Sequence, residues 1–209
     1  MITLHHLNFS RSTRVLWLLE ELGIDYDLIR YERTAGFRAP DTLKEVHPLG
    51  KAPVLQDDDL TLAESATILA YLAQRYGDGR FTPAAGTTDA AIHDEWLQYG
   101  ESSAGLPIMM TLLGGMLGGL PETMSRFTTP ELKKAFDYIE SRITSAGPYL
   151  MGETFTIADI QLAYMIDVAE SSGMLGEHPA LSSYLATLKA RPALSRAIEI
   201  GGPMHPRRG

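Results

Sequence analysis

The pattern of this chain changes once, at residue 77. Before that point, short apolar runs alternate with helical patterns in the order strand, helix, strand, helix, strand, strand, helix. After it, every convincing apolar periodicity is helical. The Gly-, Pro- and Thr-rich stretch DGRFTPAAGTT at 78–88 is typical of a linker. We therefore predict a mixed sheet carrying helices in residues 1–77 and an all-helical segment in residues 89–201.

The individual elements follow from apolar spacing and from turn residues. In the first part we predict strands at 2–6, 26–31, 54–56 and 60–63, and helices at 12–22, 41–46 and 65–76. In the second part we predict helices at 89–120, 130–146, 156–170, 181–189 and 194–200. The first of these should break or bend near Pro107 and at its glycine pairs. Thr156 and Asp159 have the spacing of a capping box, and residues 202–209 are expected to form a flexible tail.

The composition limits the chemistry that the chain can perform. The net charge of −8 disfavours binding to nucleic-acid phosphates, which require clustered cations. The absence of cysteine excludes disulfides, thiolate metal sites and cysteine nucleophiles, so any sulfur chemistry must use sulfur from a ligand. The uncharged stretch at 102–121 has membrane-spanning length, but Pro107 and two glycine pairs favour a buried helix. We predict no membrane insertion.

The stretch HHLNFSRSTRVLWLLEELG, at 5–23, joins a predicted strand to a predicted helix and places its charges unfavourably. Arg11 and Arg14 lie at the positive end of the helix dipole, and Glu20 and Glu21 lie at the negative end. A bound ligand carboxylate, or an acidic residue of a partner subunit, would explain the two arginines. Acidic residues of the same chain would explain them equally well.

Three motifs occur in the order and spacing of one family: SRSTRVLWLLEELG at 10–23, HPLGKAPVLQDDDLTLAESATILAYLAQRYG at 47–77, and FTIADI at 155–160. Through them the chain resembles the cytosolic glutathione transferases, in a bacterial-like form with a serine-type (theta/zeta-like) active site. The resemblance implies a thioredoxin-like N-terminal domain, followed by an all-helical domain that contributes an electrophile pocket and a dimer interface. It also implies a cytoplasmic homodimer that uses glutathione as co-substrate and requires no metal.

The resemblance assigns catalytic roles to two serines. Ser10 matches the hydroxyl that donates a hydrogen bond to the glutathione sulfur, and Ser12 is the alternative donor. From the residues alone, either serine is also explained as the N-cap of the following helix. A free thiol has a pKa of about 8.5, so lowering that pKa by about two units requires roughly 2.7 kcal/mol of preferential thiolate stabilisation. A hydroxyl donor, a helix N-terminus and a nearby cation can supply it together.

The same resemblance assigns the residues that bind the rest of glutathione. Pro53 is expected to be cis, with the backbone of Ala52 pairing with the tripeptide as an added strand would. Ser65 is expected to bind the γ-glutamyl carboxylate at a helix N-terminus, and Glu64 is expected to bind the ligand's ammonium group. The basic residues of the expected glutathione site are Arg11, His47 and Lys51.

The helix after the linker supplies the candidate electrophile pocket. Its candidate residues are Tyr99, Ser103, Leu106, Met109 and Met110. Methionine suits adaptable apolar surfaces, but it is also a common core residue, so burial in the core is the alternative reading. Glu101 is a candidate to reach the ligand bound by the other subunit. His5 and His6 lack metal-like companions, and we read both as structural.

The leading functional prediction is an enzyme that conjugates the glutathione thiolate to small hydrophobic electrophiles. Binding both reactants side by side removes the entropy of their encounter. One alternative is glutathione-dependent peroxide reduction, isomerisation or dehalogenation at the same site. The other is a non-catalytic glutathione-binding module that keeps the fold.

Overall fold

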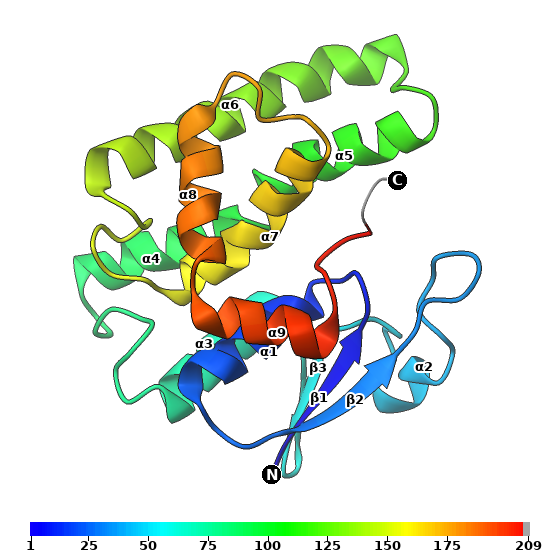
Figure 1. Cartoon of the computed structure of the whole chain (residues 1–209), viewed down its shortest axis with the longest axis vertical. Coiled ribbons are helices and arrows are strands. Elements are labelled where there is room, and N and C mark those ends of the chain that lie inside the picture. The colour runs from blue at the N-terminus through cyan, green and yellow to red at the C-terminus, as the bar shows by residue number, and fades with distance from the viewer. Residues whose placement is uncertain (207–209) are drawn as a thin grey trace. The chain divides into compact units, whose positions relative to one another are not determined.

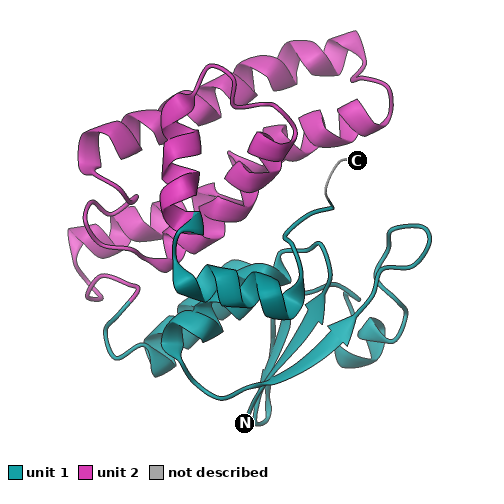
Figure 2. Cartoon of the chain, viewed as in Figure 1, with its two compact units in different colours: residues 1–80, 189–209 teal, residues 81–188 magenta. Residues whose placement is uncertain are grey.

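The computed structural model describes residues 1–206 of the chain (Figure 1). These residues form two compact units. Unit 1 comprises Met1–Arg80 together with the chain from Lys189 onward, and unit 2 comprises Phe81–Leu188 (Figure 2). The first boundary between the units therefore falls within the predicted linker.

Unit 1 is built on a four-stranded mixed sheet in the order β2-β1-β3-β4. β1 (Ile2–Leu7) pairs in parallel with β2 (Asp27–Tyr31) and antiparallel with β3 (Val54–Asp57). β3 in turn pairs antiparallel with β4 (Leu60–Ala63). The predicted mixed sheet in the first part of the chain is confirmed.

The helices of unit 1 are α1 (Ser12–Leu22), α2 (Leu43–Val46), α3 (Ser65–Tyr76) and α9 (Pro192–Gly201). α1 packs against β1, α3 and α9. Leu18 and Leu19 on one face of α1 are fully buried, and so are Leu16 and Trp17 on its other sides. α1 is buried on several sides because helices and the sheet surround it.

α9 departs from the domain organisation expected from the sequence, which assigned residues 89–201 to the helical domain. It belongs to unit 1, where it lies along α1 (Figure 1). Arg191 contacts both carboxylate oxygens of Glu21, at 2.6 and 2.9 Å, and Arg196 contacts Glu20 at 3.0 Å. These ion pairs explain the acidic residues at the C-terminal end of α1, where the helix dipole alone disfavours them.

The end of α9 requires a glycine. A Cβ atom on Gly201 would lie 2.6 Å from the side chain of Leu16 and 2.9 Å from Nε2 of His6. Beyond it, Met204 is only 4% exposed, so the tail that we expected to be flexible is packed at this residue. The rest of that predicted tail, at 207–209, lies outside the described residues.

The helices of unit 2 are α4 (Thr88–Tyr99), α5 (Gly105–Met116), α6 (Glu122–Ala146), α7 (Ile157–Ser171) and α8 (Pro179–Lys189). α7 is buried from Ile157 to Ala169 and forms the centre of the unit. Its predicted capping box is confirmed, since the Thr156 N–H donates to Asp159 Oδ2 at 2.8 Å. Asp159 also accepts hydrogen bonds from the Leu150 N–H and from the Tyr184 hydroxyl, both at 2.9 Å.

Two prolines bear on the predicted helices: the break near Pro107 is confirmed, and the helix start at Pro130 is not. The helix expected at 89–120 is divided into α4 and α5 before Pro107, which lies in the first turn of α5, where its missing N–H costs little. α6 begins at Glu122 and carries Pro130 in its interior, whereas the sequence indicated a helix start at Pro130. Burial of neighbouring residues such as Thr128 sustains the helix through the missing hydrogen bond, because packing stabilises helices more than local propensity does.

The uncharged stretch at 102–121 forms α5 and the turn that follows it. Gly118 and Gly119 in this turn have φ angles of 90° and 118°, which residues with a Cβ rarely adopt. Within the described part of the chain, none of the helices combines the length and the apolar character needed to cross a membrane.

Candidate functional site

The strand register gathers the predicted glutathione-binding residues at one end of the unit 1 sheet. His5 on β1 is opposite Val54 on β3, and Val54 is opposite Ala63 on β4. The C-terminal end of β1, the N-terminal end of β3 and the C-terminal end of β4 therefore lie at the same end of the sheet. We call the residues that adjoin these strand ends the sheet-end site: Ser10, Arg11, Ser12, Lys51, Ala52, Pro53, Glu64 and Ser65.

Ser10 and Ser12 form a buried pair of hydroxyls between β1 and α1. Ser10 is 6% exposed and Ser12 is fully buried, and their Oγ atoms are 2.7 Å apart. The Ser12 N–H donates to Ser10 Oγ at 3.2 Å, and the Leu7 N–H donates to Ser12 Oγ at 3.2 Å. The Leu7 carbonyl oxygen lies 2.8 Å from Ser10 Oγ and 3.1 Å from Ser12 Oγ. Both hydroxyls thus have partners in the β1–α1 turn, and Ser10 is the more exposed.

His6 connects this pair of serines to α9. Its Nδ1 lies 2.9 Å from Ser12 Oγ, and its Nε2 lies 2.9 Å from the carbonyl oxygen of Gly201. Burial lowers the pKa of His6 below its ordinary value, so the ring is neutral at neutral pH. Reading the sequence, we took His6 to be structural and missed its contact with the candidate site. A histidine near two serines is a weak signal when its other partner lies 195 residues away.

Contacts across the sheet hold the end of β1 in place. His5 bridges the Tyr31 hydroxyl and Gln56 Oε1, both at 2.9 Å, which fits its reading as a structural residue. Arg33 donates to the carbonyl oxygen of Phe9 at 2.7 Å. Phe9 has a φ of 51°, in the left-handed region that residues other than glycine seldom adopt. The turn before α1 therefore has a conformation that its surroundings impose.

A buried arginine connects the first turns of α1 and α3. Arg14 is 1% exposed, and its Nη1 donates to Ser65 Oγ at 3.1 Å. Ser65 is itself buried and is the first residue of α3. A guanidinium group therefore lies beside a helix N-terminus, and both favour an anion there. Arg14 is thus engaged within its own chain, which accounts for part of the unfavourable charge at the start of α1.

Glu64 precedes α3 in an unusual backbone conformation. Its φ is 69° and its ψ is 112°, and its side chain is exposed. Strained positions of this kind cluster at ligand-binding and active sites. The Ala52–Pro53 peptide bond is cis, as the resemblance implied.

The three basic residues expected to bind ligand carboxylates differ in their surroundings. Arg11 occupies the N-cap position of α1 and is half-buried. Lys51 is exposed in the loop that leads to β3. His47 is half-buried after α2, and its Nδ1 accepts the Leu49 N–H at 3.3 Å. Their roles in carboxylate binding stay predictions.

Unit 2 contains a cavity of about 140 Å³ between α5 and α6. Its lining consists of Ser103, Leu106, Pro107, Met110, Phe127, Thr128 and Glu131. Three of the predicted pocket residues, Ser103, Leu106 and Met110, belong to this lining. Small-molecule pockets usually measure ~300 Å³ or more, so this cavity accommodates only a small group. Met109 and Glu101 are half-buried residues outside the lining, and the predicted role of Glu101 in a partner subunit's site stays a prediction.

Tyr99 lies in an aromatic cluster, where the sequence had indicated a pocket residue. Its ring centroid is 5.4 Å from that of Trp96 and 5.2 Å from that of Tyr138. Burial raises the pKa of Tyr99 to about 12, so its hydroxyl is protonated at neutral pH. Among the residues described around the cavity, Tyr99 is not part of the lining. Ser103 does line the cavity, and the turn between α4 and α5 separates it from Tyr99.

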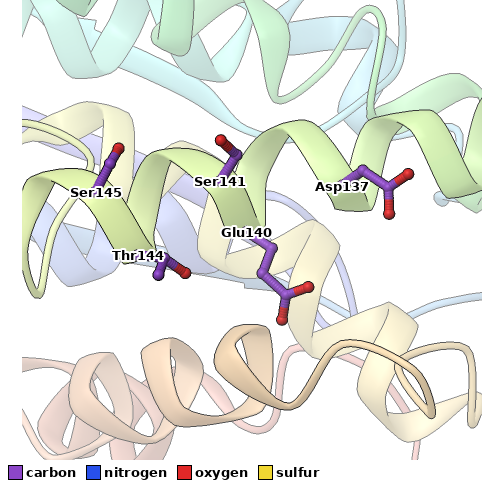
Figure 3. Close-up of a pocket in the computed structure, with 5 residues that line it drawn as sticks. All are labelled: Asp137, Glu140, Ser141, Thr144 and Ser145. Atoms are coloured by element: carbon purple, nitrogen blue, oxygen red, sulfur yellow. The ribbon is translucent and has the colours of Figure 1, made fainter.

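A larger hollow of about 450 Å³ lies along α6 (Figure 3). Its lining residues are Asp137, Glu140, Ser141, Thr144 and Ser145. Glu140 accepts the Ala180 N–H at 3.1 Å and lies 3.0 Å from His178 Nδ1, so it stabilises the N-terminus of α8. Two carboxylates make this hollow a poor site for an anionic tripeptide. Glu140 in this hollow makes structural contacts, and none of the predicted site residues belongs to the lining.

The fold and the sheet-end site define a protein with a thioredoxin-like N-terminal domain, a mixed four-stranded sheet and a helical C-terminal domain. Comparison with known families agrees with this description. Residues 1–74 match the family described as "Glutathione S-transferase, N-terminal domain", and residues 119–199 match "Glutathione S-transferase, C-terminal domain". The chain belongs to the glutathione S-transferase family and is a glutathione S-transferase.

Individual relatives support the same conclusion. Glutathione S-transferase 3 of Schizosaccharomyces pombe is 32% identical over 217 residues, covering 95% of this chain and 87% of the relative. The crystal structure of a glutathione S-transferase from Actinobacillus pleuropneumoniae superimposes with a TM-score of 0.87, at 35% identity, over 96% of this chain and 93% of that chain. Glutathione transferase URE2P6 from Phanerochaete chrysosporium, solved in complex with oxidized glutathione, has a TM-score of 0.80 at 26% identity and covers 95% of each chain.

Proposed function

We propose that this transferase uses Ser10 as the hydrogen-bond donor to the glutathione sulfur and conjugates the resulting thiolate to small hydrophobic electrophiles. The observation that carries the proposal is the place of Ser10 in the sheet-end site, in the turn between β1 and the N-terminus of α1. Ser12 is fully buried and bonded on several sides, which makes it the weaker candidate for contact with a ligand.

The thiolate requires a site that favours sulfur in its charged form. A thiol with a pKa of about 8.5 is mostly protonated at neutral pH. A hydrogen bond from the Ser10 hydroxyl and the partial positive charge at the N-terminus of α1 both stabilise the anion more than the neutral thiol. A lower thiol pKa raises the fraction of nucleophile present when the electrophile binds.

The γ-glutamyl end of glutathione fits the first turn of α3. The Arg14 guanidinium, the α3 N-terminus and Ser65 together favour the carboxylate, and exposed Glu64 favours the ammonium group. The backbone of Ala52 would pair with the cysteinyl part of the ligand as an added strand does. Lys51 and His47 would take the glycyl carboxylate.

Unit 2 would contribute the electrophile pocket through Ser103, Leu106 and Met110. A methionine and a half-exposed leucine adapt to varied apolar shapes, which suits a site that meets different electrophiles.

We propose that no metal takes part in the reaction. We also propose that the protein acts in the cytoplasm, which fractionation of cells would test.

A homodimer is also part of the proposal. Several large apolar side chains of unit 2 are exposed: Leu113, Met116, Leu117, Met124 and Phe127. Exposed apolar residues in such number are typical of an interaction surface. Sedimentation should therefore give a mass near twice the 22.9 kDa of one chain, and a monomer at micromolar concentration would contradict the dimer.

The decisive experiment on the thiolate compares Ser10→Ala with Ser12→Ala. Loss of one hydrogen bond to a charged group is worth roughly 1.5–3 kcal/mol, so Ser10→Ala should raise the pKa of bound glutathione by about one to two units. Thiolate absorbance against pH measures this shift directly. A shift in Ser12→Ala with none in Ser10→Ala would reverse the assignment of the two serines.

An activity panel tests the reaction class. Turnover of an aryl halide with glutathione is expected, and a vinyl ketone and an organic hydroperoxide should be assayed beside it. Turnover of the hydroperoxide alone would favour the reductase alternative. Tight glutathione binding without any turnover would favour a binding module.

A further inference from the structure

The hydroxyl of Ser10 is the first member of a continuous line of buried hydrogen-bonding groups. Its Oγ lies 2.7 Å from Ser12 Oγ, which lies 2.9 Å from Nδ1 of His6. Nε2 of the same ring lies 2.9 Å from the carbonyl oxygen of Gly201, at the end of α9. The line thus runs from the sheet-end site through the interior of unit 1 to α9.

The donor at each step follows from the chemistry of the atoms. A carbonyl oxygen only accepts, so the ring hydrogen of His6 is on Nε2 and points to Gly201. In the neutral ring Nδ1 is then an acceptor, and the Ser12 hydroxyl donates to it. Because Ser12 has a single hydroxyl hydrogen, a hydrogen bond between the two serines uses the Ser10 hydrogen, which has a second acceptor in the Leu7 carbonyl oxygen at 2.8 Å. When Ser10 donates to Ser12, every donor in the line points inward; one lone pair of Ser10 Oγ accepts the Ser12 N–H, and the other is available to the thiol.

We propose that this line is a proton relay, through which His6 receives the proton that the bound glutathione thiol releases. The inference rests on the proposed function, in which Ser10 is the partner of the sulfur. Ser10 contacts the ligand, and His6 acts on it only through Ser12 and Ser10. The inward order of donors is the order that such a transfer requires, since each oxygen can accept a proton on one side and pass one on.

The transfer is balanced, because three protons each move by one position along the line. The S–H bond breaks as the thiol proton binds Ser10 Oγ, the original Ser10 hydrogen moves to Ser12 Oγ, and the original Ser12 hydrogen moves to His6 Nδ1. The products are a thiolate that accepts a hydrogen bond from Ser10, and an imidazolium that donates from both ring nitrogens. Its two acceptors are then Ser12 Oγ and the Gly201 carbonyl, so no heavy atom has to move.

The charges around His6 decide when it can hold a proton. Burial lowers the pKa of His6, the Gly201 carbonyl raises it, Arg30 on β2 lowers it, and Glu32 after β2 raises it. The groups that contact the ring from α1 and α9 are the Ser12 hydroxyl and the Gly201 carbonyl. Forming the thiolate adds a negative charge at the outer end of the relay, which favours the imidazolium. The thiol and His6 therefore ionise as a coupled pair.

The test is nitrogen NMR of protein with ¹⁵N-labelled histidine at neutral pH, which reports the protonation of each ring nitrogen. Without ligand, His6 should be neutral with its hydrogen on Nε2. Saturating glutathione should convert it to the imidazolium, whereas S-methylglutathione, which has no thiol proton, should leave it neutral. His5, bonded to Tyr31 and Gln56 in the same sheet, is the internal control and should not respond to either ligand. A His6 ring that stays neutral beside bound thiolate overturns the proposal.

A pair of matched variants separates the relay from a structural role. His6→Asn offers an acceptor to Ser12 but takes up no proton, so it should raise the pKa of the bound thiol. The neutral-pH rate should then fall about tenfold for each unit of that rise and recover at alkaline pH, while KM for glutathione changes little. His5→Asn removes a comparable buried ring and should leave the pH profile unchanged. If Ser10→Ala shifts the thiol titration and His6→Asn does not, the relay fails and the serine donor stands. If neither shifts it, both proposals fail.

Discussion

The sheet-end site and the unit 2 cavity are built in opposite ways. At the sheet end, Ser12 and Arg14 are almost completely buried, and each is held by hydrogen bonds to other elements of unit 1. In the cavity, Leu106 and Phe127 are 57% and 60% exposed, and Met110 supplies a flexible apolar chain. One site is a fixed polar framework, and the other is a partly open surface whose lining is mainly apolar.

The difference matches what each site has to recognise. A charged tripeptide has polar groups at fixed spacings. The residues that bind it therefore lose least conformational entropy on binding when folding has already fixed their positions. A varied set of apolar electrophiles has no common polar pattern, so a soft apolar lining serves better than a rigid one. The contrast predicts that substitutions at the sheet end will cost more affinity than substitutions in the cavity.

The largest effect is expected at the first turn of α3. Replacing both Glu64 and Ser65 with alanine should weaken glutathione binding by about 2 kcal/mol or more, or roughly 30-fold, because charge-assisted hydrogen bonds are lost. Titration calorimetry measures the change. Leu106→Ala, in the cavity, is the control and should leave glutathione affinity nearly unchanged. Equal affinity in the double variant and the parent would remove both residues from the site.

A smaller effect is expected in the cavity. Leu106→Ala should lower kcat/KM for an apolar aryl halide by about fivefold, since losing apolar contact in a pocket costs roughly 1 kcal/mol. Leu113→Ala is a matched control, because Leu113 is a half-exposed leucine of the same helix that is absent from the described lining. Equal losses in the two variants would mean that this cavity does not bind the electrophile.

The smallest effect concerns the buried framework and pH. The pKa of His6 is lowered in the folded, ligand-free protein from an unfolded value of 6.5, so the unfolded chain binds the proton more readily. The neutral His6 ring contributes fully to the stability of the folded protein at pH values above the unfolded pKa of 6.5. This contribution is lost as the pH falls from 6.5 towards the lower pKa of the folded protein. His6→Asn should therefore reduce the slope of unfolding free energy against pH in this window, whereas His5→Asn serves as the reference. Urea titrations at several pH values give the slopes, and equal slopes for His6→Asn and the parent would contradict the neutral buried ring.

Much of unit 1 was predictable because its signals are local. The strands and helices before residue 77 follow from apolar periodicity, and the helix starting at Ser12 ends at Leu22 as predicted. The capping box of Thr156 and Asp159 is a pattern of four consecutive residues, and it forms as expected. For the sheet-end site, the motifs named the candidate residues, and the strand register of the structure shows that they adjoin one end of the sheet.

Other features depend on residues that are distant in sequence. Pro130 favoured a helix start by its local chemistry, yet packing carries α6 through it. Tyr99 was expected in the pocket as part of the helix after the linker, but the turn between α4 and α5 separates it from Ser103, and its ring lies in an aromatic cluster. In both cases a tertiary contact outweighs a local preference.

By itself, the sequence determined the class of fold, the elements of unit 1 and the chemical character of the candidate site, because these depend on neighbouring residues and on motif spacing. Only the tertiary structure decided that α9 returns to α1, where Arg191 and Arg196 pair with two glutamates that the helix dipole disfavours. It alone also decided that His6 contacts Ser12 and Gly201 at once. The physical reason is that charge pairing and buried hydrogen bonding are satisfied in space, between groups up to 195 residues apart, and leave no periodic trace along the chain.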